Sequence, residues 1–161
     1  MPANQNRPGS PGNSESPGSA TGARRVLKRL GDAECMELLR TGRIARLVYD
    51  SQYGPVALPF EYQVYQGSIV FRTYRTLLTE EDLRTGIPHA DYAVAVEIDQ
   101  TDPVAREGWI VTVWGAAHNV DTEAERAAIA GVGLESWIEG EPEHFIRVTP
   151  TRIAGQRLCQ A

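Results

Sequence analysis

The connections between successive apolar segments of this chain are too short to join parallel strands. Three apolar runs, at residues 43–49, 56–65 and 68–73, follow one another with only a few turn residues between them. Parallel neighbours need a crossover connection of a dozen or more residues, whereas antiparallel strands need only a tight turn. The sequence therefore predicts a mainly β, antiparallel fold with a few short helices. Because closure removes exposed sheet edges, we expect a barrel rather than a doubly wound sheet.

The dipeptide Gln66-Gly67 separates two alternating apolar runs and predicts a β-hairpin. The second strand of this hairpin ends in Arg72, and three further polar side chains follow before a short helix expected at 76–85: Thr73, Arg75 and Thr76. An arginine can bind phosphate oxygens through two parallel hydrogen bonds. We therefore expect a phosphate group at Arg72, held mainly by side chains.

Local signals predict the remaining elements. A helix begins at Asp32, which we expect to cap it, and ends at Thr41-Gly42. Thr122 and Glu125 form a capping box for a second helix that ends near Gly131. The other apolar segments predict strands at 92–98, 109–120, 145–149 and 152–158, with a polar loop at 99–108.

Two positions within the predicted strands carry further information. Proline cannot donate a ladder hydrogen bond, so Pro59 predicts an edge or a bulge in the second strand, which is either a simple edge or a place where a planar ring meets free backbone groups. In the strand at 109–120, side chains alternate between two faces, which places Trp109 and Trp114 on opposite faces. We expect both tryptophans to be packed.

Composition separates a tail from a domain. Residues 1–29 hold five of the 16 Lys and Arg residues and one of the 21 Asp and Glu residues, and residues 1–23 have no apolar pattern. We expect a disordered basic tail at 1–29 and a single domain at 30–161. The domain is acidic, which disfavours specific nucleic-acid binding.

The sequence lacks the motifs of several common sites and the signals for a membrane or for secretion. Cys35 and Cys159 fit no metal or redox spacing, and the three histidines, His89, His118 and His144, form no metal-ligand array. No Walker loop or serine-hydrolase elbow is present. Without a long apolar run or a secretory signal, we expect a cytoplasmic protein that does not insert into a membrane.

Taken in order, the elements and four short motifs resemble the pyridoxamine 5'-phosphate oxidase-like, flavin-binding split-barrel family. The resemblance covers roughly residues 30–158, and the motifs that carry it are Phe71-Arg72-Thr73, Glu97-Ile98-Asp99, Gly108-Trp109 and Ile153-Ala154-Gly155-Gln156-Arg157-Leu158. This resemblance implies a split β-barrel that forms a homodimer, with flavin mononucleotide (FMN) between the subunits. It gives no catalytic side chain.

The resemblance also implies cofactor-binding residues. The phosphate would meet the side chains around Arg72, the flavin ring would lie against the backbone of Pro59 and Phe60, Trp109 would form a wall of the site, and Arg157 would contact the cofactor or the interface. One departure concerns Leu77, which stands where similar sequences have a lysine in the phosphate site. Three acidic residues follow, Glu80, Glu81 and Asp82, and an ion pair from Arg72 to one of the two glutamates is the alternative to phosphate binding.

The function implied is that of an FMN-dependent oxidoreductase acting on an unknown small substrate. The missing lysine keeps a deazaflavin-dependent reductase open as an alternative. A non-catalytic cofactor-binding, haem-binding or sensing module is the alternative from another class, with a single histidine as the haem ligand. An empty structural dimer is a third.

Overall fold

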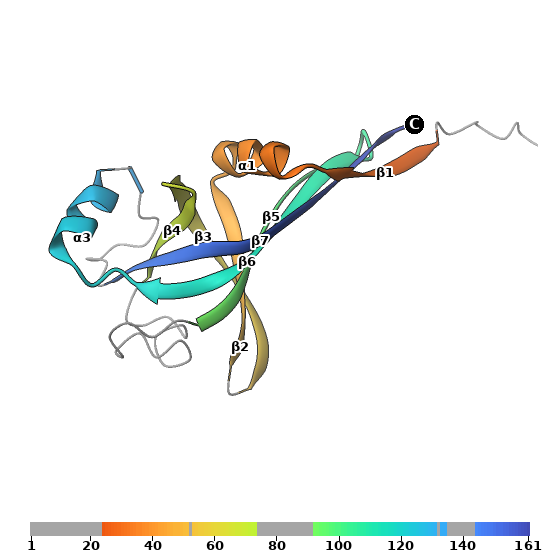
Figure 1. The fold of residues 1–161 in the computed structure, drawn as a ribbon. Coiled ribbons are helices and arrows are strands. Elements are labelled where there is room, and N and C mark those ends of the chain that lie inside the picture. The colour runs from red at the N-terminus through yellow and green to blue at the C-terminus, as the bar shows by residue number, and fades with distance from the viewer. Residues whose placement is uncertain (1–23, 52, 74–91, 132, 135–143) are drawn as a thin grey trace, which may run out of the picture.

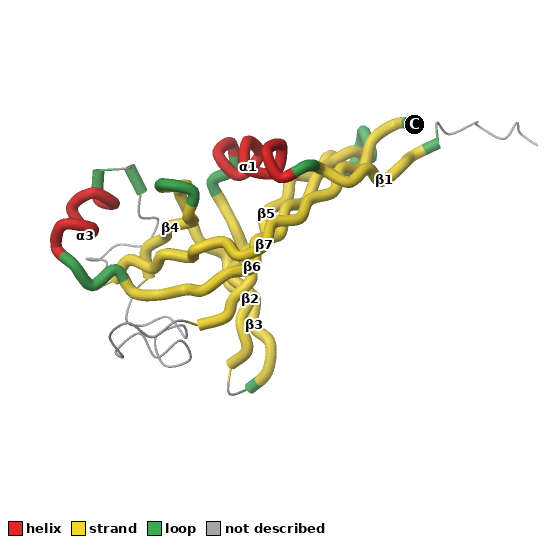
Figure 2. The backbone as a smooth tube through the Cα atoms, viewed as in Figure 1, coloured by secondary structure: helices red, strands yellow, loops and turns green. Residues whose placement is uncertain are grey.

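The computed structural model describes residues 24–51, 53–73, 92–131, 133–134 and 144–161. The described elements are β1 (Arg25–Leu30), α1 (Asp32–Thr41), β2 (Ile44–Ser51), β3 (Gly54–Tyr65), β4 (Ser68–Thr73), β5 (Tyr92–Asp102), β6 (Glu107–Asn119), α3 (Glu123–Ala130) and β7 (His144–Gln160). The helix expected at 76–85 lies outside the described residues. Strand dominates what is described, as Figure 2 shows.

The strands form one antiparallel sheet that closes on itself. Its order is β1-β7-β4-β3-β2-β5-β6, and an additional pairing joins β6 back to β7. This second pairing of β7 turns six of the strands into a barrel, while β1 lies outside the ring and pairs with the end of β7. The predicted fold class, a mainly β antiparallel barrel, is confirmed.

The hairpin at the centre of the sequence interpretation forms as predicted. Gln66 and Gly67 both have positive φ, 49° and 77°, which suits the tight turns that match strand twist. The turn sets the register of β3 against β4, in which Tyr62 pairs with Phe71. Arg72 therefore lies just past the last paired residues of this hairpin.

Pro59 lies in the half of β3 that pairs with a neighbouring strand along only one of its two edges in the described residues. β3 pairs with β2 from Gly54 to Glu61, and Pro59 faces Arg46 there, but its pairing with β4 begins only at Tyr62. Within the described residues, no strand pairs with the other edge of β3 at Pro59. The expectation of an edge at this proline is confirmed.

Helix α1 spans the predicted residues, but its cap differs. Gly31 is the N-cap residue and makes no side-chain hydrogen bond, whereas Asp32 is the first helical residue. Asp32 is therefore an acidic residue of the first turn, where it favours the helix dipole, and not the cap. Helix α3 has the predicted cap, because Thr122 Oγ1 accepts a hydrogen bond from the Glu125 amide at 3.3 Å.

The polar loop expected at 99–108 is mostly strand. β5 and β6 pair continuously out to Asp102 and Glu107, so only residues 103–106 form the turn. Asp102 Oδ1 accepts hydrogen bonds from the amides of Val104 at 2.8 Å and Ala105 at 2.9 Å. The turn lies inside the predicted loop, but the polar residues on either side of it remain in the ladder because their partners are also extended.

The C-terminal segment is also longer than predicted. The two strands expected at 145–149 and 152–158 are one strand, β7, whose register against β6 shifts between Trp114 and Gly115. The bulge absorbs the irregularity at Pro150 that suggested a break.

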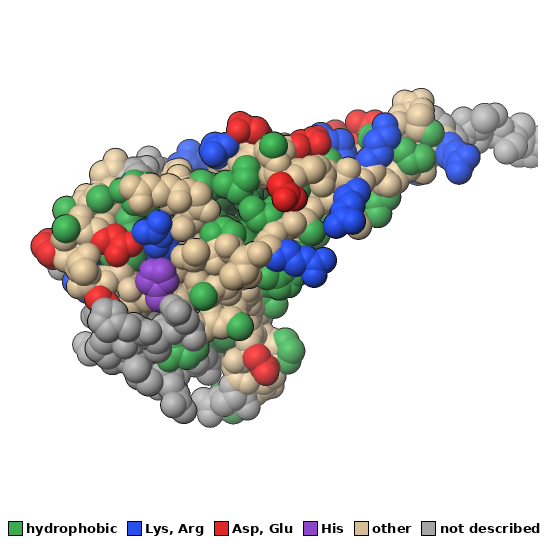
Figure 3. Space-filling view, in the orientation of Figure 1, with side chains coloured by type: hydrophobic (Ala, Val, Ile, Leu, Met, Phe, Trp, Pro, Cys, Tyr) green, Lys and Arg blue, Asp and Glu red, His purple; other side chains and the backbone are tan. Residues whose placement is uncertain are grey.

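Part of the expected basic tail is a strand. Residues 25–30 form β1, which pairs with β7 from Gly155 to Gln160. The domain therefore begins before residue 30, whereas residues 1–23 lie outside the described residues. Figure 1 shows β1 and the end of β7 extending away from the barrel beside the β5–β6 turn, at the end opposite α3. We call this part, β1 with the adjoining ends of β5, β6 and β7, the arm; Figure 3 shows basic side chains along it.

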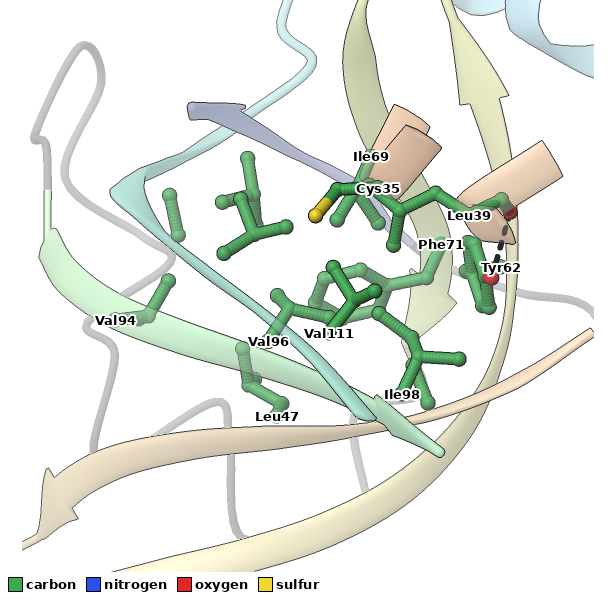
Figure 4. Close-up of a cluster of buried hydrophobic side chains, with 14 of the residues drawn as sticks. Cys35, Leu39, Leu47, Tyr62, Ile69, Phe71, Val94, Val96, Ile98 and Val111 are labelled. Atoms are coloured by element: carbon green, nitrogen blue, oxygen red, sulfur yellow. Dashed lines mark hydrogen bonds between the residues drawn. The ribbon is translucent and has the colours of Figure 1, made fainter. Parts of the chain in front are cut away.

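The main core fills the barrel and continues under α1. Leu39, Leu47, Phe71, Val96 and Val111 are among its fully or almost fully buried side chains. Tyr62 Oη donates a hydrogen bond to the carbonyl oxygen of Leu39 at 2.7 Å, which joins α1 to the barrel (Figure 4). A second small cluster, Val70, Val120, Ile129 and Leu134, packs α3 against the outside of the barrel.

Candidate functional site

Arg72 lies at the end of β4 and has an unusual environment. Its neighbours on either side, Phe71 and Thr73, are 2% exposed, while Arg72 itself points to the opposite face of the strand and is half-buried. Its guanidinium carbon lies 5.4 Å from the ring centroid of Phe145, its partner on β7. Its Nε is buried and has no hydrogen-bond partner in the described part of the chain. Buried polar atoms are nearly always hydrogen-bonded, so this donor lacks a partner that its position would normally have.

The structure brings four of the expected site residues together. Phe60 packs against Phe71, with ring centroids 4.1 Å apart, so the Pro59-Phe60 segment lies beside the end of β4 that carries Arg72 and Thr73. Pro59 is exposed and Phe60 half-buried. The free edge of β3 and the Arg72 side chain therefore border one region. Arg75, Thr76 and Leu77 lie outside the described residues.

Trp109 and Arg157 lie far from this region in the same chain. Phe145, the β7 partner of Arg72, and Arg157 are 12 residues apart on β7, and Trp109 pairs with Arg157. At about 3.3 Å per residue, that separation is roughly 40 Å. Within one subunit the eight expected residues therefore cannot surround one small molecule.

Both of these residues also have structural partners. Trp109 is 9% exposed and belongs to the main core, so it offers little surface to a ligand. Arg157 Nη2 lies 2.8 Å from Glu34 Oε1 and so links β7 to α1. Trp114, which we expected to be packed, is 38% exposed, and Arg152 lies 5.0 Å from its ring.

Glu61 follows Phe60 on β3 and is not among the residues expected at the site. Its side chain is only 7% exposed, and its Oε1 lies 3.1 Å from Arg43 Nη2. The other oxygen, Oε2, is buried and has no hydrogen-bond partner in the described residues. The register of the hairpin was the signal that could have identified it: Tyr62 and Phe71 are the last pair, and Glu61 and Arg72 are the next residue on each strand.

A shallow groove lies on the outside of the barrel, where the β2–β3 hairpin diverges from β5. It has a volume of about 410 Å³ and a mostly apolar lining that includes Val48, Pro55, Ala95 and Trp114. Pro55 is on the same strand as Pro59, four residues earlier, so the groove and the Arg72 region lie along one strand.

Titratable groups elsewhere have structural roles. Burial raises the pKa of Tyr62 to about 12, and burial together with Asp32 and Glu34 raises the pKa of the Cys35 thiol. A raised thiol pKa keeps Cys35 protonated and unreactive. Among the described residues, no group of three or more His, Cys, Asp or Glu side chains could hold a metal ion, and no described helix is long and apolar enough to span a membrane.

The closed antiparallel barrel defines the class of protein as a split-barrel fold. The sequence pattern of the pyridoxamine 5'-phosphate oxidase family matches residues 31–157. The chain belongs to this family, and the resemblance inferred from its motifs is confirmed.

Several individual proteins are similar to this chain. The uncharacterized protein Rv0080 of Mycobacterium tuberculosis is 30% identical over 140 residues, which cover 87% of this chain and 90% of that protein. A solved structure of an FAD-binding protein from Mycobacterium smegmatis is similar with a TM-score of 0.65 and 26% identity, covering 82% of this chain and 100% of the other. An FAD-binding protein from Mesorhizobium loti has a TM-score of 0.66 at 17% identity, covering 85% and 100%, which shows a shared fold.

Proposed function

We propose that this protein is a flavin-binding oxidoreductase that uses FMN and acts on a small substrate. The observation that carries the proposal is the buried, unpartnered Nε of Arg72 beside the unpaired edge of β3 at Pro59. A guanidinium with a free donor suits a phosphate, and an unpaired strand edge offers backbone groups to the polar edge of a flat ring. The flavin-binding relatives support the same ligand class.

The bound flavin would supply hydride or electron transfer. The protein's own residues would bind and orient the cofactor. Arg72 would donate hydrogen bonds to phosphate oxygens, and the Phe145 ring would hold its guanidinium in place. The backbone of Pro59 and Phe60 would orient the flavin ring. Phe60 and Phe71 would exclude water from the inner side of this region. No side chain is assigned a proton-transfer step.

The protein would act as a homodimer. Arg72 and the Trp109–Arg157 pair lie at opposite ends of β7, so both could meet one cofactor only if the second group came from another subunit. The arm also carries an apolar face, Leu27, Ile110 and Leu158, which are 61%, 39% and 37% exposed. Leu27 pairs with Leu158, and Ile110 lies two residues beyond Gly108, the β6 partner of Leu158, so the three side chains share one side of the sheet. A second copy would cover this apolar arm face.

Deazaflavin is the second candidate cofactor, because Leu77 removes a positive charge that a phosphate site in this family would use. A haem-binding or sensing module remains the alternative from another class. The choice depends on the ligand that the purified protein holds.

The test is an absorption spectrum of the purified full chain, followed by titrations with FMN, FAD, a deazaflavin and haem. Flavin bands in the visible region, or saturable binding of FMN, are expected. Turnover with a nicotinamide electron donor would then establish an enzyme. A protein that binds haem alone would replace the proposal with the haem module, and one that binds none of the four would refute cofactor binding.

A further inference from the structure

The Glu61 side chain has the chemistry of an incomplete binding site. Its carboxylate is almost fully buried, and among the described residues only Oε1 has a partner, the Arg43 guanidinium at 3.1 Å. A buried carboxylate oxygen without a hydrogen bond carries a desolvation cost that a ligand donor would remove. Oε2 can only accept a hydrogen bond, so its partner must be an O–H or N–H group.

The second part of this site is Arg72. The hairpin ladder ends with the pair Tyr62 and Phe71, and one further step in the same register would set Glu61 across from Arg72. The contact between Phe60 and Phe71 shows that the two strands remain close there. Directly opposed side chains in an antiparallel pair have Cβ atoms roughly 5 Å apart. In the described residues, Glu61 Oε2 and Arg72 Nε each lack a hydrogen-bond partner, and the alternation along β3 and β4 puts both side chains on the face opposite to Tyr62 and Phe71.

Charge decides which ligand group each residue would take. A phosphate dianion has no proton to donate and would be repelled by Glu61, so it belongs at Arg72. Arg43, on the far side of Glu61, offsets the carboxylate charge and leaves the trio with a net positive charge. The ligand group that binds Glu61, beside the phosphate, must therefore be a neutral hydrogen-bond donor. A polyol chain that carries a phosphate has hydroxyl groups next to it that can act as this donor. Carboxylates are common acceptors for sugar hydroxyls in nucleotide sites.

We infer that Glu61 and Arg72 together recognise a phosphorylated polyol chain, with Arg72 binding the phosphate and Glu61 Oε2 accepting a hydrogen bond from a hydroxyl of the same chain. This inference rests on the proposed flavin site. In that site the chain is the ribityl phosphate of the cofactor, with its phosphate at Arg72 and one of its hydroxyl groups at Glu61. Arg43 is a positioning residue, because it holds Oε1 and so aims Oε2.

The experiment compares three ligands by flavin fluorescence: FMN, riboflavin, which lacks the phosphate, and lumiflavin, which lacks the whole polyol. The full-length variants are Glu61→Leu, which removes the acceptor, Glu61→Gln, which keeps one neutral acceptor, and Arg72→Ala. Glu97→Leu is the matched control, because Glu97 is also a strand carboxylate paired with an arginine, Arg46, at 2.9 Å. Melting temperatures check that each variant is folded.

Glu61→Leu is expected to weaken FMN and riboflavin binding by roughly ten- to 100-fold and to leave lumiflavin binding unchanged. Glu61→Gln should lose less, and Glu97→Leu should lose nothing. Arg72→Ala should weaken FMN binding alone. An equal loss for lumiflavin would place Glu61 against the ring and overturn the assignment, and no loss for any ligand would remove Glu61 from the site.

A separate ligand distinguishes failure of this inference from failure of the proposed function. If the wild-type protein binds no flavin, calorimetric titration with ribitol 5-phosphate tests the site by itself. Binding that Glu61→Leu abolishes would support polyol phosphate recognition while the flavin proposal falls. Absence of binding in the wild type would overturn both.

Discussion

Two aromatic residues hold Arg72 in position. Phe71 anchors its strand in the core, and Phe145 lies under the guanidinium at 5.4 Å. This arrangement orders a long side chain before any ligand arrives, which reduces the entropy lost on binding. The residue expected from sequence to hold a phosphate is thus pre-positioned by its neighbours on β4 and β7.

Replacing Arg72 with alanine should weaken FMN binding by about tenfold or more, which corresponds to roughly 1.4 kcal/mol, because a charge-assisted hydrogen bond is lost. The fold should be retained, since the side chain is not part of the core. Fluorescence titration measures the affinity, and Arg152→Ala, which removes another arginine stacked on an aromatic ring, is the control. Equal affinities for Arg72→Ala and wild type would remove Arg72 from the site.

Tyr62 offers a test of the link between α1 and the barrel. Burial raises its pKa from 10.0 to about 12, so the folded state keeps the phenolic proton at a pH where the unfolded state has lost it. The stability contributed by this group is fully present below pH 10.0 and is lost as the pH rises toward about 12. Tyr62→Phe should therefore be less stable at neutral pH, through loss of the bond to Leu39, but should lose less further stability over that interval. Urea unfolding at several pH values measures both effects, and parallel alkaline losses in the two proteins would contradict the assignment.

At the scale of elements, β7 organises the molecule. One edge of this strand pairs with β6 along nearly its whole length, and the other pairs first with β4 and then with β1. The same strand therefore closes the barrel, supports Arg72 through Phe145, and carries the arm. Cys35 of α1 packs closely against Gly155, the residue where β7 leaves the barrel for the arm.

Strand β1 is expected to be essential for the stability of the fold, although its sequence resembles a solvated basic linker. A chain that begins at residue 24 should melt close to the full-length protein, because the composition of residues 1–23 offers little to bury. A chain that begins at residue 31 should be less stable by about 2 kcal/mol or more, since it loses the buried Leu30 and the β1–β7 ladder. Thermal melts of the two truncations make the comparison, and similar melting temperatures would show that β1 contributes no stability.

At the scale of the whole molecule, the separation of Arg72 from Arg157 explains why a second subunit is expected. The apolar arm face should lie in its interface, so Ile110→Glu and Leu158→Glu should each shift the protein from dimer to monomer. Val104→Glu is the matched control, because Val104 is 92% exposed at the tip of the β5–β6 turn and is not on that face. Analytical ultracentrifugation measures the masses. A wild-type monomer, or variants that remain dimeric, would refute this interface.

The sequence by itself determined the local elements. The turn at Gln66-Gly67, the capping box at Thr122 and the edge at Pro59 depend on residues a few positions apart, so their signals are complete within a short window. The hairpin also determined the neighbourhood of Arg72. The short connections predicted the antiparallel barrel, and the family motifs added its split-barrel type and the flavin as the expected ligand.

The tertiary structure decided what depends on pairing between distant segments. Closure of β6 on β7, the recruitment of residues 25–30 as β1, and the roughly 40 Å between Arg72 and Arg157 come from ladders that join residues far apart in the chain. The same is true of Glu61, whose one unsatisfied oxygen is apparent only once Arg43 and the end of β4 are in place. Periodicity and turn signals specify which segments are extended, but a strand with two available edges does not encode which partners will occupy them, and that choice is made by burial of the whole core.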